Sequence, residues 1–417
     1  MADRPTVVLV GTLDTKGVEY DYLRRRVREA GCDALLVDVG SGGPPQVAPD
    51  IGREEVARAA GADAAELARR GDRGLAVATM ARGATVIARD LHQRGLLHGI
   101  LGLGGSGGSA LATAAMRALP IGVPKLMVST MASGDTRPYV GTADIAMLYS
   151  VVDIAGINRV SARILANAAA AIAGMAHAYA AAGAEAPGQP LVAATMFGVT
   201  TPCVTEARRR LEELGYEVLV FHAVGTGGQA LEALVDAGYL AGVLDATTTE
   251  LADELVGGVL SAGPHRLEAA GARGVPQVVS LGALDMVNFG PLDSVPERFR
   301  GRRLYRHNPT VTLMRTTPTE CAELGRVIAR KLNAATGPVA LFLPLRGVSA
   351  IAVAGGVFHD PEADRALLTT LRAELRPDIE VHELDLDIND ARFARAMAEQ
   401  LDQLIRAGAG AATRQDG

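Results

Sequence analysis

The sequence predicts an α/β fold of two related Rossmann-like domains, each a doubly wound parallel sheet, with a cleft between them. Three observations lead to this prediction: the length of 417 residues, the alternation of short apolar runs with Ala-, Leu- and Arg-rich segments, and an internal repeat. A chain of this length exceeds one ordinary domain. Strands that alternate with helices form parallel sheets covered by helices, so the pattern indicates the α/β class.

The expected strands follow the β-branched and apolar runs in chain order, and helical segments lie between them. In the first half the expected strands are residues 6–10, 34–39, 99–103 and 125–129. In the second half they are residues 191–196, 217–222, 242–244, 277–281, 339–343 and 380–384. Helices are expected between the strands, for example at residues 17–30, 201–214 and 388–405.

The repeat relates a segment from Gly11, GTLDTKGVEYDYLRRRVREAGCDALLVDVGSGG, to one from Phe197, FGVTTPCVTEARRRLEELGYEVLVFHAVGTGG. Each runs from a strand through a glycine turn and an Arg-rich helix to a second strand and G-S/T-G-G. Both copies later reach Gly-Val-Pro before another strand. The repeat predicts one domain at residues 1–185 and another at 190–410, joined near APGQP (186–190), with 411–417 as a flexible tail.

The composition excludes several classes of function. The net charge of −6, the pI near 5.8 and the lack of Trp favour neither nucleic-acid nor membrane binding. The three cysteines lie far apart and form no metal or disulfide pattern, which favours a reducing cytoplasm. The chain begins MADRPTVVLVGT, without a signal-type region, and its alanine-rich stretch 164–183 is expected to be a helix of a water-soluble protein.

The stretch ILGLGGSGGSALATAAM (100–116) carries the most specific chemistry. Gly102, Gly104 and Gly107 satisfy G-x-G-x-x-G, but no acidic residue ends the next strand, so a dinucleotide is disfavoured. A Walker A lysine is also missing. The stretch therefore predicts an anion held by backbone N–H groups at a helix N-terminus, and a tight packing turn is the alternative. The second copy reads VLDATTTE (243–250), so the anion is expected in the first domain.

Two further turns of the first copy add polar groups. VGTLDTKG (10–17) offers Thr12, Asp14 and Thr15, which either cap a helix or contact a ligand, and Lys16, which could pair with phosphate. Asp38 ends the second strand, where a carboxylate can accept from a ribose or can initiate a turn.

The loop VSTMASGDTRPYVGTAD (128–144) follows the fourth strand. Ser129, Thr130 and Ser133 are candidate phosphate donors. Asp135 is a candidate ligand of Mg²⁺, a cation that prefers oxygen, and Arg137 could pair with phosphate. Since parallel strands present their carboxyl ends at one edge, these loops predict one nucleotide site.

The second domain supplies the candidate catalytic residues. RHNPTVTLMRTTPTE (306–320) and LPLRGVSAIAVAGGVFHDPEAD (343–364) are interpreted as polar loops after strands. Imidazole titrates near neutrality, so the histidines are candidate proton carriers, although a structural role is the alternative for each. The candidates are His307, Arg346, His359 and Asp360, and Asp285 and Asn288 could belong to the same crevice.

Four motifs, GTLDTKG, LGLGGSGGS, VSTMASGDTRPYVGTADI and RGVSAI…GGVFHDPEAD, resemble the family of Tm-type ATP-binding domains. This family is typified by the N-terminal half of the tobamovirus resistance protein of tomato, and the resemblance spans about residues 5 to 405. It implies ATP bound mainly by the first domain, a homodimer, and a separate TIM-barrel partner. One departure is that Ala352 and Val353 stand where the family usually carries an acidic residue. The implied ATP contacts are Gly11, Thr12, Asp14, Thr15, Lys16, Asp38, Gly104, Gly105, Ser106, Gly107, Gly108, Ser129, Thr130, Met131, Ser133, Gly134 and Asp135.

Three functions remain open from the sequence. The first is an enzyme that uses ATP or a phosphorylated metabolite at the cleft between the domains. The second is a regulatory or scaffold protein that binds the nucleotide without breaking a bond, which the absent Walker lysine and nucleophile–base pair favour. The third, an NAD-dependent oxidoreductase, is the weakest because the acidic residue is missing.

Overall fold

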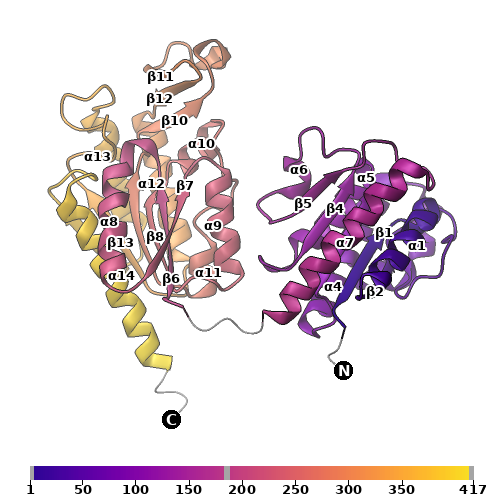
Figure 1. Cartoon of the computed structure of the whole chain (residues 1–417). Helices are drawn as coiled ribbons and strands as arrows, with labels where there is room; N and C mark the ends of the chain where they lie inside the picture. The colour runs from indigo at the N-terminus through magenta and orange to yellow at the C-terminus, as the bar shows by residue number, and fades with distance from the viewer. Residues whose placement is uncertain (1–3, 183–187, 413–417) are drawn as a thin grey trace. The chain divides into compact units, whose positions relative to one another are not determined.

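Two parallel sheets, one in each half of the sequence, form the centre of the computed structural model, which describes residues 4–182 and 188–412 (Figure 1). The chain divides into two compact units, Met1–Ala186 (unit 1) and Pro187–Gly417 (unit 2). The predicted α/β class with two Rossmann-like domains is confirmed. The predicted tail at 411–417 starts inside the last helix, which reaches Ala412, and residues 413–417 lie outside the described residues.

Unit 1 contains a five-stranded sheet in the order β2-β1-β3-β4-β5, with all neighbouring strands parallel. Both faces are covered by helices, so β3 and β4 are buried along their whole length, including Lys125 and Ser129 at the two ends of β4. The short edge strand β5 was not predicted. The strands are β1 (Thr6–Gly11), β2 (Asp33–Asp38), β3 (Gly99–Gly104), β4 (Lys125–Ser129) and β5 (Ala146–Tyr149).

The two faces of this sheet have separate hydrophobic cores. Val8 and Val10 of β1 share one core with side chains of α2, α4 and α5, while Val7 and Leu9 share the other with α1 and α7. Alternate residues of a strand point to opposite faces, so β1 contributes to both. The helices are α1 (Leu13–Glu29), α2 (Arg53–Ala59), α3 (Ala64–Arg70), α4 (Arg73–Gln93), α5 (Ser106–Arg117), α6 (Arg137–Val140) and α7 (Arg159–Ala181).

Within the described residues, α7 is the one helix long and apolar enough to cross a membrane. Its alanine-rich face, including Leu165, Ala169 and Ile172, is buried against the sheet of unit 1. A helix that packs one face against the sheet of a water-soluble protein can have this composition too.

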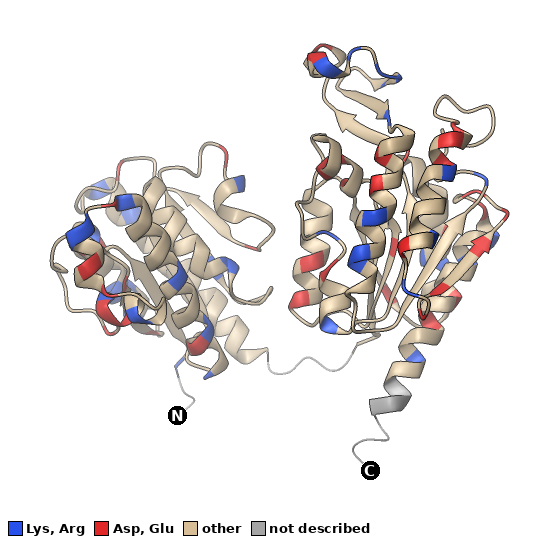
Figure 2. Ribbon diagram, turned by 180° about the vertical axis from the view of Figure 1, so that it is seen from behind, with Lys and Arg blue, Asp and Glu red and all other residues tan. Residues whose placement is uncertain are grey.

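Unit 2 contains a six-stranded parallel sheet in the order β14-β13-β9-β8-β6-β7. Its β7-β6-β8-β9-β13 portion repeats the β2-β1-β3-β4-β5 order of unit 1, as the sequence repeat predicts. Figure 2 shows Lys, Arg, Asp and Glu mainly on helices and loops, with the central strands largely free of them. The strands are β6 (Leu191–Met196), β7 (Glu217–His222), β8 (Gly242–Thr247), β9 (Gln277–Gly282), β13 (Val339–Pro344) and β14 (Glu380–Leu384).

The helices of unit 2 lie between these strands in the chain, except for α14, which follows the last strand. The helix α8 packs with α14, and α12 packs with α13. They are α8 (Thr201–Glu213), α9 (Thr226–Asp236), α10 (Glu250–Val256), α11 (Ala269–Arg273), α12 (Pro318–Asn333), α13 (Pro361–Glu374) and α14 (Ala391–Ala412). Short 3₁₀ turns occupy Gly198–Thr200, Leu292–Ser294 and Glu297–Phe299.

An antiparallel three-stranded sheet, β10 (Met286–Phe289), β12 (Val311–Arg315) and β11 (Leu304–Asn308), is inserted between β9 and β13. The segment 306–320, interpreted from the sequence as a loop, therefore contains the end of β11, all of β12 and the start of α12. The interpretation was wrong because VTLMR is short, does not alternate and is flanked by turn residues, so only its pairing with β10 and β11 defines it as a strand.

Candidate functional site

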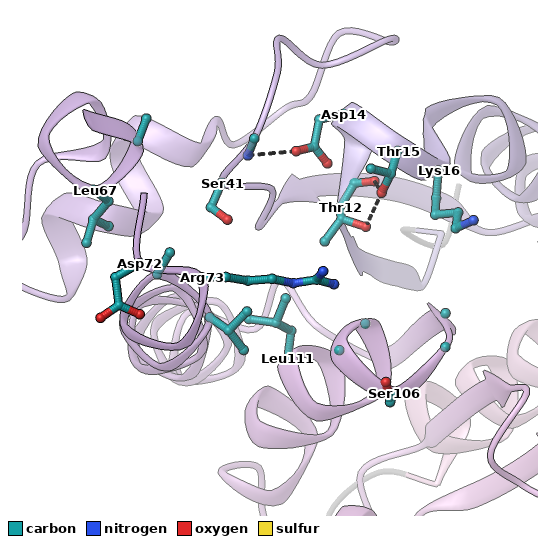
Figure 3. Close-up of a pocket in the computed structure, with 18 of the residues that line it drawn as sticks. Thr12, Asp14, Thr15, Lys16, Ser41, Leu67, Asp72, Arg73, Ser106 and Leu111 are labelled. Carbon is teal, nitrogen blue, oxygen red and sulfur yellow. Dashed lines mark hydrogen bonds between the residues drawn. The ribbon is translucent and has the colours of Figure 1, made fainter. Parts of the chain in front are cut away.

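A cavity of about 530 Å³ lies at the carboxyl ends of β1 and β3 in unit 1 (Figure 3). Ligands of open parallel sheets bind at this edge, so the position agrees with the predicted site. A neighbouring cavity of about 400 Å³ shares Ser41, Leu67 and Ala68 with it. The lining residues of the first cavity are Thr12, Asp14, Thr15, Lys16, Ser41, Gly42, Leu67, Ala68, Gly71, Asp72, Arg73, Ala76, Val77, Gly104, Gly105, Ser106, Gly107, Gly108, Leu111 and Asp153.

One wall of the cavity is the glycine turn (residues 104–108), where β3 ends and α5 begins. Gly105 is the N-cap of α5, and no side chain caps this helix end. The first N–H groups of a helix have no partner inside the helix, so those of α5 are available to an acceptor. Together with the positive end of the helix dipole, they form a place for an anion.

The glycines of this turn do not all serve packing. A Cβ built on Gly104 would lie 2.9 Å from Gly108 Cα, and one on Gly102 would lie 2.5 Å from Ala112 Cβ, so a close approach of the backbone requires both glycines. Gly105 and Gly107 are different, because their built Cβ atoms come no closer than 3.6 Å and 3.9 Å to another atom. Packing therefore does not explain these two glycines, whereas an open cavity does.

The 12–16 turn, which comprises the N-cap and the first turn of α1, forms the opposite wall (Figure 3). The hydroxyls of Thr12 and Thr15 are 2.9 Å apart, and Asp14 Oδ2 accepts from the Gly42 N–H at 2.8 Å. Lys16 Nζ donates to the Ile154 carbonyl, and the Lys16 backbone departs from helical geometry. The predicted residues Thr12, Asp14, Thr15 and Lys16 thus line the cavity, with Lys16 tied to the loop that follows β5.

Gly11 and Asp38 are not among the residues that line the cavity. A Cβ on Gly11 would overlap the Tyr20 ring, so packing requires this glycine. Asp38 is fully buried, and its Oδ1 accepts from the N–H groups of Leu13 at 3.1 Å and Gly40 at 2.9 Å. Burial raises the pKa of Asp38. Its position ties the start of α1 to the turn after β2, and a ribose contact would require this turn to open.

The predicted loop after β4 also lies outside the cavity lining, from Ser129 through Thr130, Met131, Ser133 and Gly134 to Asp135. Ser129 is fully buried, and its hydroxyl is 2.7 Å from that of Ser109. Asp135 is exposed and forms a bidentate pair with Arg137, whose hydrogen bonds lower the Asp135 pKa to about 2. In the described part of the chain, no group of three or more His, Cys, Asp or Glu residues has the arrangement of a metal site.

Sequence reasoning missed one cation of the cavity. Arg73 is the first residue of α4, and in Figure 3 its side chain extends between the 12–16 turn and the glycine turn. Its Nη2 atom lies 3.9 Å from a Cβ built on Gly107. Among the residues that the structure describes, none forms a hydrogen bond or ion pair with this guanidinium. In the sequence, Asp72 indicates the start of a helix, but this start does not follow a predicted strand. The sequence therefore gave no reason to place Arg73 at the cavity.

The cavity is also lined by residues that the sequence did not predict. Leu67, Ala68, Ala76, Val77 and Leu111 provide an apolar side of the cavity. Ser41 and two acidic residues, Asp72 and Asp153, add polar groups. Asp72 accepts from Leu75 N–H at 3.0 Å and Asp153 from Ile154 N–H at 2.8 Å, so each carboxylate also fixes its own loop.

The four candidate catalytic residues of unit 2 do not converge on one cavity. His307 is exposed on β11, and Arg346 is exposed and paired with Asp385. His359 Nδ1 is 3.4 Å from the Ala352 carbonyl oxygen, and Asp360 caps α13 by accepting from Ala363 N–H at 3.1 Å. None of the four lines the open depression of about 1030 Å³ beside β11.

Comparison with known proteins places the whole chain in one family. The family described as "Uncharacterised protein family (UPF0261)" matches with its N-terminal domain at residues 5–181 and its C-terminal domain at 189–405. The chain belongs to the UPF0261 family. This UPF0261 chain is 52% identical to a UPF0261 protein of Clostridium tetani over 401 residues, which cover 96% of the chain and 98% of the relative.

The tomato proteins confirm the predicted family resemblance. The ToMV resistance protein Tm-1(GCR237) of Solanum lycopersicum is 47% identical over 332 residues, or 78% of the UPF0261 chain and 44% of the tomato protein. Among solved structures, a UDP-N-acetylglucosamine 2-epimerase covers 96% of each chain at 12% identity with a TM-score of 0.24. A similarity this low supports no statement about the site.

Proposed function

We propose that unit 1 binds ATP, as a complex with Mg²⁺, in the cavity between the 12–16 turn and the glycine turn. The observation that carries this proposal is the junction of β3 and α5, where uncapped helix N–H groups meet an open cavity that also contains Lys16 and Arg73. Amide donors at a helix N-terminus together with cations form a site for phosphate. The apolar side around Leu67, Val77 and Leu111 offers contact for a base.

ATP, rather than another phosphorylated molecule, is proposed because the family resemblance implies it. Asp135 is the proposed Mg²⁺ ligand; because it lies outside the cavity lining and pairs with Arg137, its loop would have to move toward the cavity and exchange this pair for the cation. The homodimer, the separate TIM-barrel partner and the cytoplasmic location are part of the same proposal and rest on the resemblance and the composition.

The cavity favours binding over covalent chemistry. Its titratable side chains are Asp14, Lys16, Asp72, Arg73 and Asp153, and no His or Cys lines it. Three of the carboxylates already accept a backbone N–H, so no nucleophile–base pair is formed. We therefore propose nucleotide binding as the primary property, with turnover dependent on a co-substrate or on the barrel partner.

Thermal unfolding of the full chain with ATP, ADP and NADH, each with and without Mg²⁺, tests the proposal. At a concentration about 100 times its dissociation constant, ATP with Mg²⁺ is expected to stabilise the folded state by about 2.7 kcal/mol. NADH is expected to have no effect.

The variant Gly107→Leu sharpens this test, because its side chain would enter the cavity without meeting another atom closely. It is expected to fold and to lose the ATP effect. Gly174→Leu is the matched control, since Gly174 is exposed on α7 with open space around it. Stabilisation by NADH alone, or equal ATP effects in both variants, would overturn the proposal.

A further inference from the structure

The two units can be compared residue by residue at the strand-to-helix junction. In unit 1, Val7 of β1 pairs with Gly99 of β3, and in unit 2, Val192 of β6 pairs with Gly242 of β8. The helix after β3 begins at Ser106, and the helix after β8 begins at Glu250. Glu250 thus stands in unit 2 where Ser106 and Gly107 stand in unit 1.

The carboxylate of Glu250 is bound as a ligand would be. Its Oε1 accepts from the N–H groups of Gly225 at 2.7 Å and Gly228 at 3.0 Å, which belong to the second G-S/T-G-G turn. Its Oε2 accepts from Arg266 Nε at 2.7 Å. All three partners donate and so favour the carboxylate anion, while burial acts in the opposite direction and raises the Glu250 pKa.

Arg266 provides the counter-charge and is itself enclosed. Its side chain is fully buried, and it pairs with Asp245 and Glu232 as well as with Glu250. Burial disfavours the charge, but the three carboxylates outweigh it and hold the Arg266 pKa well above its usual value. In unit 2 the chain therefore supplies its own anion, its own cation and the glycine turn between them.

Unit 1 has a glycine where unit 2 has Glu250, and its nearby arginine is the exposed Arg73 of α4, whereas Arg266 follows α10. Gly107 has no side chain, and Arg73 faces it without a partner among the described residues. The amides of Gly40 and Gly42 donate to Asp38 and Asp14, whereas no side chain caps the first N–H groups of α5, which have no partner inside the helix. What is missing in unit 1 is an acceptor between these amides and Arg73.

We infer that Glu250 is an internal substitute for a ligand phosphate, and that in unit 1 the corresponding space holds a phosphate of the bound nucleotide with Arg73 as its cation. This inference rests on the proposed nucleotide site and assigns its phosphate-binding arginine. It also assigns one phosphate site to the chain, because Glu250 closes the counterpart in unit 2.

Calorimetric titration of the full-length Arg73→Gln variant with ATP, ADP and adenosine tests the assignment. The affinity for ATP and ADP is expected to fall about tenfold or more, because a charged hydrogen-bond partner is lost, while the affinity for adenosine is unchanged. The control is Arg82→Gln, an exposed arginine of the same helix that does not line the cavity. Unchanged ATP binding by Arg73→Gln would overturn the inference while leaving ATP binding itself intact.

A second experiment needs no nucleotide. Gly107→Glu places a carboxylate in unit 1 as unit 2 has one, and the space beside Gly107 admits it. Its melting temperature is expected to fall by several degrees when Arg73→Gln is added, whereas Arg73→Gln alone changes the wild type little.

If the two substitutions act independently, no anion lies between Gly107 and Arg73, and the inference fails. If wild-type protein binds no nucleotide but this coupling is found and pyrophosphate binds, the proposed function fails and the phosphate site stands.

Discussion

At the residue scale, Asp285 is a carboxyl group that unit 2 buries completely. Its Oδ2 accepts from the Ser349 hydroxyl at 2.9 Å, while its Oδ1 is buried without a hydrogen-bond partner among the described residues. Burial raises the Asp285 pKa to about 6, although the charge of Arg315 opposes the shift. An isolated buried charge is costly, so the folded state favours the protonated form.

This shift predicts a loss of stability as the pH rises from about 4 to about 6. In that window the folded state binds more protons at Asp285 than the unfolded state, so the free energy of unfolding decreases with pH. Asp285→Asn removes the titration and keeps an acceptor for Ser349. As the pH rises from about 4 to about 6, the free energy of unfolding of this variant is expected to increase by about 2–3 kcal/mol relative to that of the wild type.

Denaturant unfolding at a series of pH values measures this difference. Hydrogen exchange of the β9 amides, which precede Asp285 in the chain, is a second measurement. Ser294→Ala, which removes an exposed hydroxyl bonded to the Pro291 carbonyl, serves as a variant without a titrating group. Parallel pH curves for the wild type and Asp285→Asn would show that Asp285 does not titrate in this range.

At the element scale, Thr317 illustrates a polar residue that serves a helix. Thr316 and Thr317 are two hydroxyl residues that directly precede α12. In the structure, Thr317 Oγ1 accepts from Glu320 N–H at 3.2 Å, and Glu320 Oε2 accepts from Thr317 N–H at 2.8 Å. This reciprocal arrangement is a capping box at the start of α12.

Thr317→Ala is expected to reduce the free energy of unfolding by about 1 kcal/mol, because one helix N–H loses its acceptor. Thr319→Ala, in the same helical turn but exposed, is expected to change it little. Denaturant unfolding of both variants measures the difference. An equal loss in the two variants would show that the cap contributes nothing beyond helix propensity.

At the scale of the whole molecule, the two units share the order of five strands and differ in the residues at the equivalent strand-to-helix junction. Unit 1 has glycines and an open cavity at the end of β3. Unit 2 has Glu250 held by Arg266 at the end of β8. In unit 2 the buried pair of Glu250 and Arg266 is complete and stabilises one arrangement. In unit 1 Arg73 lines the cavity and is available to pair with an anion.

Hydrogen exchange in the presence of ATP and Mg²⁺ is therefore expected to slow in unit 1 alone. The protected amides should be those of β1, β3 and the first turn of α5, because these border the cavity. The amides of β8 and α10 should exchange at the same rate with and without the nucleotide. Equal protection of β8 and α10 would contradict the assignment of one site to unit 1.

The sequence by itself determined the features that depend on local order along the chain. Apolar runs of strand length predicted the parallel strands, and the paired segments from Gly11 and Phe197 predicted two units with the same strand order. The glycine turn was also predictable, because several glycines between a strand and a helix indicate a close approach of the backbone or an anion site. These features involve neighbours in the sequence.

Only the tertiary structure decided which polar side chains border the cavity. Asp38 ends a strand as predicted, yet its carboxylate is buried and accepts hydrogen bonds from a backbone N–H of α1 and from one of its own turn. Arg73 lies far in sequence from both turns that it faces, and α3 and α4 bring it there. The direction of a side chain depends on packing against distant segments, and this packing is absent from any local pattern of residues.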